Sequence, residues 1–356
     1  MPPVQNNKTN IGAPNVTATT VSLDAPVIRR PAKRRRWGFA VFLALWVVLL
    51  ALIVNKHQAI SDWWQLRGYQ PPSAVARLAD QDTMTGYTRH LFYLNKPQLL
   101  STVASFRKDC PENEDTIVLG CYHPNQQGIF IYDVQDSSLS GVTQVTAAHE
   151  VLHAIYGRLS EKQRAYVDGL LNNYYQHGLT NQRVKDEIAL YKKTEPHDVT
   201  DEMNSTFGTE IVDLPPALES YYRQYFTNRS AIVAYEQQYD GEFTTRQATI
   251  IADDAQLAAM KQQIAGQEAN LSAQLSSLNT QRAQLDGLLS GAGAAAYNDA
   301  ADTYNTQVNA YNGGVAGLQA AIAQYNQLVV TRNNVAGELT TLDKAVDTRL
   351  APQATR

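Results

Sequence analysis

The pentapeptide His149-Glu150-Val151-Leu152-His153 contains the residue types of a metal-dependent hydrolytic site. On an α-helix, side chains four residues apart lie on one face, so both imidazoles can bind one ion. Imidazole nitrogens bind zinc at about 2.0–2.1 Å, and a catalytic zinc site needs a third protein ligand and a position for water. Glu150 is placed to accept a proton from that water. The pattern predicts a zinc-dependent hydrolase; the alternative is a pair of buried histidines with ordinary structural roles.

The segment around this pentapeptide has the pattern of an amphipathic helix. Apolar side chains recur at helical spacing from residue 145 to residue 156, and no proline interrupts them. Thr143 or Ser140 is a candidate N-cap, because a hydroxyl there can accept a hydrogen bond from the first turn. Alanines at 147, 148 and 154 allow close packing around the imidazoles. We therefore expect the motif on a buried helix.

The charge of the 356-residue chain changes after its N-terminal segment. Seven basic residues and one acidic residue precede residue 55, which gives +6, whereas the whole chain carries −4 and the remainder therefore about −10. A protein that binds nucleic acid through its folded part needs the opposite balance. We expect no nucleic-acid partner.

Residues 37–54 form an 18-residue run without a charge or a proline. As a helix the run is about 27 Å long, close to the hydrocarbon thickness of a bilayer. The basic cluster at residues 29–36 precedes it directly, which favours a cytoplasmic N-terminus. We expect a disordered basic cytoplasmic tail (1–36), a single transmembrane helix (37–55), a juxtamembrane linker (56–82) and an extracellular remainder. A cleaved signal peptide is the alternative.

Cys110 and Cys121 are the only cysteines of the chain. Both fall in the part expected outside the cell, where an oxidising environment favours a disulfide. Two free buried thiols are the alternative. Their spacing does not resemble a zinc knuckle.

The region before the pentapeptide has the signals of a small sheet. Residues 89–94, 116–122 and 128–134 are rich in β-branched and aromatic residues and are expected to form strands. Residues 99–107 are expected to form a helix, and Pro71-Pro72 should precede another at 73–78. Helices are also expected at 161–176 and 182–193. The fold class predicted for residues 83–240 is α+β.

A further helix is expected from Val199 to Glu210 and supplies candidates for the third ligand. Together with the two histidines, this helix resembles the zinc-binding region of the gluzincin metallopeptidases, in which a glutamate on a second helix completes the zinc site. Their ligand helix has a small residue three positions after the glutamate, and Glu202 with Ser205 matches this spacing. Glu210 is the competitor, but it lies near the helix end. The resemblance implies a zincin-like domain with His149, His153 and Glu202 as zinc ligands.

Other features of the gluzincins are matched less closely. Thr206 stands where many members have an acid that orients the first histidine. The sequence therefore does not identify the residue that contacts the outer side of that histidine. Tyr191, Tyr221 and Tyr222 are candidates by type for stabilising the oxyanion. In that architecture the last strand, here 128–134, forms an edge beside the catalytic helix where an extended substrate can pair. The overall layout also resembles uncharacterised membrane-anchored bacterial zincins.

From about Tyr235 onward the sequence has the spacing of a coiled coil. Apolar residues recur three and four positions apart in two runs, which residues 290–293 interrupt. We expect an antiparallel helical hairpin at 241–350 with arms of about 50 residues. A dimer whose arms pair between chains is the alternative, and an envelope protein is a possible partner of the coiled coil.

Together these features predict a membrane-anchored zinc endopeptidase that uses Zn²⁺ and Glu150 to hydrolyse peptide bonds of envelope or secreted proteins. An amidase of wall peptides would differ only in its substrate. The alternative from another class is a catalytically silent zincin-fold scaffold whose coiled coil organises cell-envelope machinery. Metal content and peptide cleavage distinguish the two.

Overall fold

A computed structural model describes residues 34–111, 117–124, 128–194, 196–289, 291 and 293–349, without the side chains of residues 34–37 and 52–55. The chain divides into two units, Met1–Trp64 and Gln65–Arg356. Residues 1–33 of the predicted cytoplasmic tail lie outside the described residues.

Helix α1 (Arg34–Leu66) contains the predicted transmembrane segment and continues beyond its expected end at residue 55. Among the described residues, no helix taken alone has both the length and the hydropathy of a membrane span. Two parts of α1, Gly38–Ala51 and Lys56–Leu66, reach these values together and are bent by 63° relative to each other.

The second unit is mostly helical and contains one small sheet. Before the pentapeptide it has α2 (Ser73–Gln81), α3 (Gly86–Leu94), β1 (Gln98–Leu100), α4 (Val103–Asp109), β2 (Gly120–His123), β3 (Gly128–Tyr132) and the short 3₁₀ helix η1 (Ser137–Leu139). The helices that follow are α5 (Val142–Tyr156), α6 (Glu161–His177), α7 (Gln182–Thr194), α8 (Val199–Glu210), α9 (Pro216–Tyr222), α10 (Arg229–Leu288) and α11 (Ala294–Val346). The helices expected at 73–78, 161–176, 182–193 and 199–210 are confirmed.

The three-stranded sheet is mixed and has the order β1-β3-β2, with β1 parallel and β2 antiparallel to β3. The prediction that residues 128–134 form the edge strand is therefore wrong, because β3 is central. Strands β1 and β2 are the edges, and β2 packs against α5. The predicted strand at 116–122 begins later, at Gly120.

Two other predictions in this region are wrong. Residues 89–94 belong to helix α3, whose start is capped by the Thr85 side chain and whose Leu91, Phe92 and Leu94 are buried at helical spacing. The expected helix at 99–107 is divided, because Gln98–Leu100 pairs with β3 and α4 begins only after the N-cap Thr102. In both cases a threonine cap set the helix start, a local signal that outweighs the strand propensity of aromatic side chains.

Helix α5 lies in the centre of the core. Its buried side chains contact α8, α10, α3 and β2. The helix begins at Val142 after Gly141, so neither Thr143 nor Ser140 is the N-cap. Gly141 has φ of 110°, and a β-carbon there would lie 2.9 Å from the Tyr235 carbonyl oxygen. This close approach to α10 requires a glycine before the helix.

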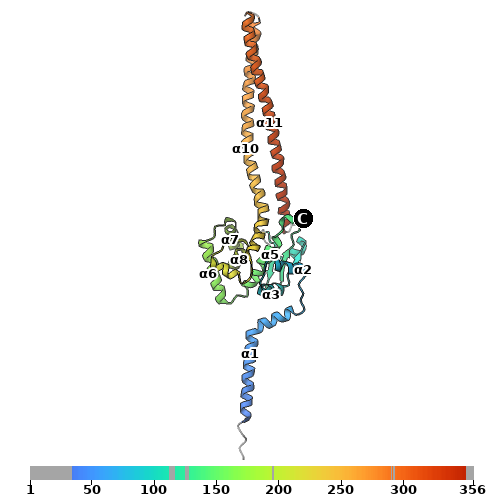
Figure 1. Cartoon of the computed structure of the whole chain (residues 1–356), viewed down its shortest axis with the longest axis vertical. Helices are drawn as coiled ribbons and strands as arrows, with labels where there is room; N and C mark the ends of the chain where they lie inside the picture. The colour runs from blue at the N-terminus through green and yellow to red at the C-terminus, as the bar shows by residue number, and fades with distance from the viewer. Residues whose placement is uncertain are drawn as a thin grey trace, which may run out of the picture. The chain divides into compact units, whose positions relative to one another are not determined.

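Helices α10 and α11 form the predicted hairpin and lie side by side (Figure 1). Their 60 and 53 residues end and resume on either side of the predicted interruption at 290–293. Ion pairs join the arms, with Arg332 Nε 2.9 Å from Asp254 Oδ1 and Arg246 Nε 3.1 Å from Glu338 Oε2. The predicted domain boundary at residue 240 falls inside α10, whose first turns are part of the core.

Candidate metal centre

Helices α5 and α8 bring His149, His153 and Glu202 together. His149 Nε2 lies 3.6 Å from Glu202 Oε2, and His153 Nε2 lies 3.6 Å from Glu202 Oε1. One ligand atom from each residue lies within 4.8 Å of the other two. The two imidazole rings have centroids 4.9 Å apart, as expected for residues one helical turn apart.

The geometry of these three side chains fits a zinc ion. Two ligand atoms bound to tetrahedral zinc lie about 3.3 Å from each other, slightly less than the observed 3.6 Å. The same separation is too long for a direct hydrogen bond between imidazole and carboxylate. Two imidazole nitrogens and one carboxylate also form the donor set of catalytic zinc sites with a position left for water.

Asp201 binds the outer nitrogen of the second histidine. His153 Nδ1 lies 2.9 Å from Asp201 Oδ1, which makes an ion pair when the ring is protonated, although the two atoms do not have the angles of a hydrogen bond. This contact leaves His153 Nε2 as the nitrogen that faces Glu202. An outer carboxylate of this kind fixes the tautomer and the orientation of a metal-binding histidine.

The electrostatics of the cluster favour a positive charge between the two rings. Burial lowers the pKa of His153, but the carboxylates of Glu202 and Asp201 outweigh burial and raise it to about 10. The pKa of His149 is also raised, because Glu202 and Glu150 outweigh burial and the neighbouring His153. Burial raises the pKa of Glu202, and the two histidines lower it by more. A divalent cation would satisfy the same carboxylates.

Glu150 is buried and lies against the edge strand β2. A β-carbon built on Gly120 would be 2.4 Å from Glu150 Oε1 and 2.5 Å from Thr146 Cγ2. Only a glycine at position 120 therefore leaves the Glu150 carboxylate in its place. The sequence did not single out Gly120, because the contact joins residues far apart in the chain.

A cleft of about 920 Å³ contains the cluster. Its walls include α5, α7, α8, the segment 117–122 and Tyr239 of α10. Of the three tyrosines proposed for the oxyanion, Tyr191 lines this cleft. Tyr222 instead donates a hydrogen bond to the Asn204 carbonyl oxygen at 2.8 Å, and Tyr221 is buried against Tyr222 and Tyr225. Tyr191 is therefore the candidate that the structure retains.

Glu210, the competing third ligand, has another partner. Its Oε2 lies 2.8 Å from a guanidinium nitrogen of Arg183. Arg183 also contacts Glu236 at 2.6 Å and Glu187 at 3.5 Å. The structure therefore places Glu202, and not Glu210, beside the two histidines.

The small residues of α8 allow it to pack tightly against α5. Ser205 is fully buried, and a β-carbon on Gly208 would lie 2.6 Å from Leu152 Cδ1 and 2.8 Å from Tyr222 Cε1. Thr206 is also fully buried, and its hydroxyl has no hydrogen-bond partner among the described residues. Asp201, rather than residue 206, therefore supplies the outer carboxylate, and it holds the second histidine instead of the first.

Comparisons with known proteins identify no relative of this chain: no protein-family model matches it, and neither does any curated protein or solved structure at a significant level.

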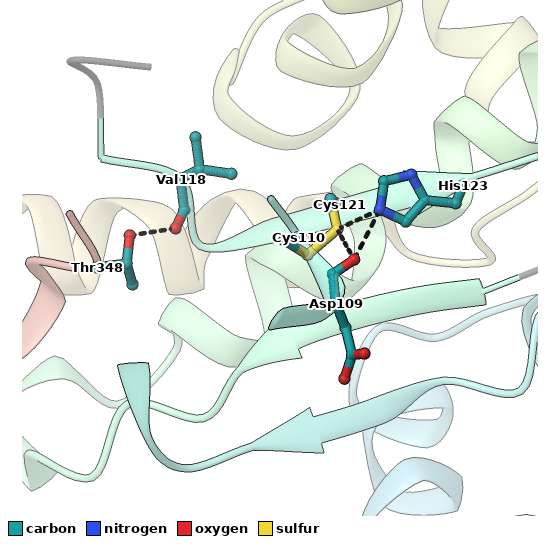
Figure 2. Close-up of a disulfide and its surroundings, with 6 residues drawn as sticks. All are labelled: Asp109, Cys110, Val118, Cys121, His123 and Thr348. Carbon is teal, nitrogen blue, oxygen red and sulfur yellow. Dashed lines mark hydrogen bonds between the residues drawn. A yellow bond between two sulfur atoms is a disulfide. The ribbon is translucent and has the colours of Figure 1, made fainter. Parts of the chain in front are cut away.

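Cys110 and Cys121 form a disulfide, as the sequence favoured (Figure 2). Cys121 belongs to β2, and Cys110 follows α4. His123 Nε2 lies 3.3 Å from Cys121 Sγ and donates to the Asp109 carbonyl oxygen at 2.9 Å. The disulfide thus joins the edge strand of the cleft to the end of α4.

Proposed function

We propose that this chain is a zinc-dependent peptidase. The observation that carries the proposal is the convergence of His149 Nε2, His153 Nε2 and the Glu202 carboxylate beside Glu150 in a cleft. These three residues would hold the ion, in the arrangement that the resemblance to gluzincins implies. When bound, zinc lowers the pKa of water in the site and polarises the scissile carbonyl group.

The residues of the chain have distinct roles in this reaction. Glu150 accepts the proton of the attacking water at a carboxylate oxygen and transfers it to the departing amine. Asp201 keeps His153 in the tautomer with a free Nε2. Tyr191 is the candidate donor to the oxyanion, since it lines the same cleft; its hydroxyl donates to Glu187 Oε1 at 3.3 Å and would have to leave this partner.

The edge strand favours an extended peptide as substrate. Gly120, Cys121 and Tyr122 line the cleft, and within the described residues β2 pairs with β3 alone. The backbone groups on its other side are available to pair with an added strand. A peptide bound there would run past Glu150, and this supports a peptidase over a hydrolase of small molecules.

The proposal includes attachment to a membrane through the apolar part of α1. The basic residues before it support a cytoplasmic N-terminus, with the cleft outside the cell. The disulfide between Cys110 and Cys121 supports an oxidising location for the cleft. Envelope or secreted proteins are then the accessible substrates.

The length of the hairpin favours a second candidate function. Arms of 60 and 53 residues exceed what the core needs, and a catalytically silent scaffold could use them to organise envelope proteins. Such a scaffold has no use for a carboxylate such as Glu150 beside the ligands. The two functions therefore differ in the role of Glu150, which is a catalytic base in the peptidase and has no catalytic role in the scaffold.

The decisive experiment uses the full-length protein in detergent, with zinc measured by mass spectrometry and cleavage measured on a library of quenched fluorescent peptides. We expect one zinc ion per chain and hydrolysis in the wild type. Glu150→Gln should keep the zinc and lose about 10²- to 10⁴-fold in rate. His149→Ala, the matched control, should lose both. Zinc binding without hydrolysis by the wild type would favour the scaffold, and no zinc binding would exclude the zinc-dependent peptidase.

A further inference from the structure

We propose that the end of the hairpin positions the catalytic edge of the cleft: Thr348 holds the segment that leads into β2, and this keeps Gly120 against Glu150. The inference rests on the proposed function, because it assigns positioning residues for the same reaction. It also gives the hairpin a role within the site.

One end of β2 is attached to the end of α4. The attachment consists of the Cys110–Cys121 disulfide and the hydrogen bond from His123 to the Asp109 carbonyl oxygen at 2.9 Å (Figure 2). Both contacts lie on the C-terminal side of Gly120. They leave the segment on its N-terminal side to be held by other residues.

The other end is attached to the segment that follows α11. The Thr348 hydroxyl donates to the Val118 carbonyl oxygen at 2.6 Å (Figure 2), and Arg107 Nε donates to the Thr348 carbonyl oxygen at 2.7 Å. Thr348 is fully buried, and Arg107 is 7% exposed. Hydrogen bonds this well shielded from water hold their partners in a defined place.

Packing of α11 brings Thr348 to this position. Leu342 and Val346, in its last turns, are buried against Leu139 of η1 and Val142 at the start of α5. Tyr239 and Phe243 of α10 pack partly against the same cluster. The hairpin therefore ends on the helix that carries the two histidines.

The direction of the Val118 carbonyl shows what Thr348 does to the edge. The Leu119 carbonyl accepts a hydrogen bond from the Tyr132 N–H at 2.8 Å, so it points to β3. Successive carbonyls of a strand point to opposite sides, so that of Val118 points to the free edge, where Thr348 binds it. Thr348 thus closes the edge at Val118 and leaves the backbone of Gly120 and Tyr122 for a substrate.

Gly120 lies between the two attachments. A shift of Val118 is transmitted along two residues of backbone to Gly120, which lies in close contact with Glu150 Oε1. The three metal-binding side chains come from α5 and α8 and do not share this connection. Loss of the Thr348 contact should therefore change the rate of reaction and leave metal binding unchanged.

Removal of the whole hairpin cannot test this, because Tyr239 lines the cleft and α11 packs on α5. The test compares Thr348→Val, which keeps the shape and removes the hydroxyl, with Thr348→Ser, which keeps the hydroxyl. Thr341→Val is the matched control, since this exposed hydroxyl only contacts the Gly337 carbonyl oxygen of its own helix. Gly120→Ala acts on Glu150 directly.

All variants are studied as full-length protein with zinc, by peptide hydrolysis and by hydrogen exchange of residues 117–123. We expect Thr348→Val to lower kcat about fivefold, with little change in KM or zinc content, and to speed exchange in this segment. Thr348→Ser and Thr341→Val should match the wild type. Gly120→Ala should lower kcat by at least about tenfold with zinc retained.

Unchanged exchange in a folded Thr348→Val variant would overturn the proposal, as would equal losses in the valine and serine variants. If Thr348→Val unfolds, the activity of Gly120→Ala decides, and wild-type kcat in Gly120→Ala would overturn the link to Glu150. A wild type that binds zinc without cleaving peptides would refute the proposed function alone, because the exchange measurement still decides whether Thr348 holds β2.

Discussion

Two neighbouring groups of carboxylates have different partners. In the first, Asp201 and Glu202 face the imidazoles of His149 and His153, and the ligand atoms surround a centre about the size of a metal ion. These carboxylates favour a positive charge at this centre. That charge is either a metal ion from outside the chain or a proton on one of the imidazoles.

In the second group, the guanidinium of Arg183 is the centre. Glu187, Glu210, Glu236 and Asp240 approach it at 2.6 to 3.9 Å. The chain supplies this cation itself. The spacing to Ser205 favoured Glu202, and the comparison adds a reason that the spacing does not contain: Glu210 is paired with Arg183, which lies on another helix.

Exchange of each carboxylate for its amide is the most direct test of this difference. Glu202→Gln should lower zinc affinity by at least about 100-fold, because it removes a ligand. Glu210→Gln should leave zinc affinity within about twofold of wild type. Competition with a fluorescent chelator measures both. Equal losses in the two variants would mean that the ligand set is not the one proposed.

Asp201→Asn should have the next largest effect. Loss of the carboxylate that holds His153 Nδ1 is expected to lower zinc affinity about 10- to 100-fold. Thr206→Val is the control, because this residue stands where gluzincins have their acid and its hydroxyl has no hydrogen-bond partner in the described part of the chain. A larger effect at Thr206 than at Asp201 would contradict the assignment of the outer carboxylate.

Arg183→Met tests the second group through the pH dependence of stability. Burial and Glu187 raise the pKa of Glu210 to about 8, although Arg183 lowers it. Burial likewise raises the pKa of Glu236 to about 7. Both groups bind a proton more tightly in the folded protein, so they lower the free energy of unfolding as the pH rises from about 5 to about 8.

Without Arg183 this decrease should be steeper. We expect a loss of about 2 kcal/mol at pH 8 and a much smaller one at pH 5, less than for a fully buried pair because the Arg183 side chain is 43% exposed. Thermal unfolding at both pH values measures it. Arg332→Met, on an exposed ion pair of the hairpin, should change little at either pH. A loss independent of pH would argue against a role of the carboxylates.

Asp82 allows a smaller test of the same comparison, because this carboxylate faces neither an imidazole nor a guanidinium among the described residues. It is fully buried, and neither of its oxygens has a hydrogen-bond partner among the residues that the structure describes. Burial raises its pKa well above the usual value, so its ionisation destabilises the fold as the pH rises. Asp82→Asn should stabilise the protein by about 1 kcal/mol at pH 7 and by less at pH 4. A destabilised variant at pH 7 would point to a partner of the charged form.

Sequence reasoning succeeded where a signal is repeated over a long segment or concentrated in a short motif. The hairpin and helices such as α6 and α8 have periodic patterns, and the pentapeptide fixes His149 and His153 on one helical face. It failed for residues 89–94, where short aromatic runs suit a strand or a helix equally. Their helical state depends on the cap at Thr85.

The missed parts of the candidate site depend on contacts between distant residues. Asp201 stands next to Glu202 in the sequence, but only the packing of α8 on α5 shows that it reaches the opposite nitrogen of His153. The closeness of Gly120 to Glu150 depends on the order of strands, which places β2 at the edge. Neither contact has a periodic signature in the sequence.

The hydrogen bond between Thr348 and Val118 joins residues 230 positions apart, and that between Arg107 and Thr348 joins residues 241 apart. During synthesis, helix α5 with its two histidines emerges long before Thr348 does. The two hydrogen bonds of Thr348 therefore cannot form until translation has passed residue 348. On the proposed function, the positioning of Gly120 against Glu150 would be among the last steps in the maturation of the site.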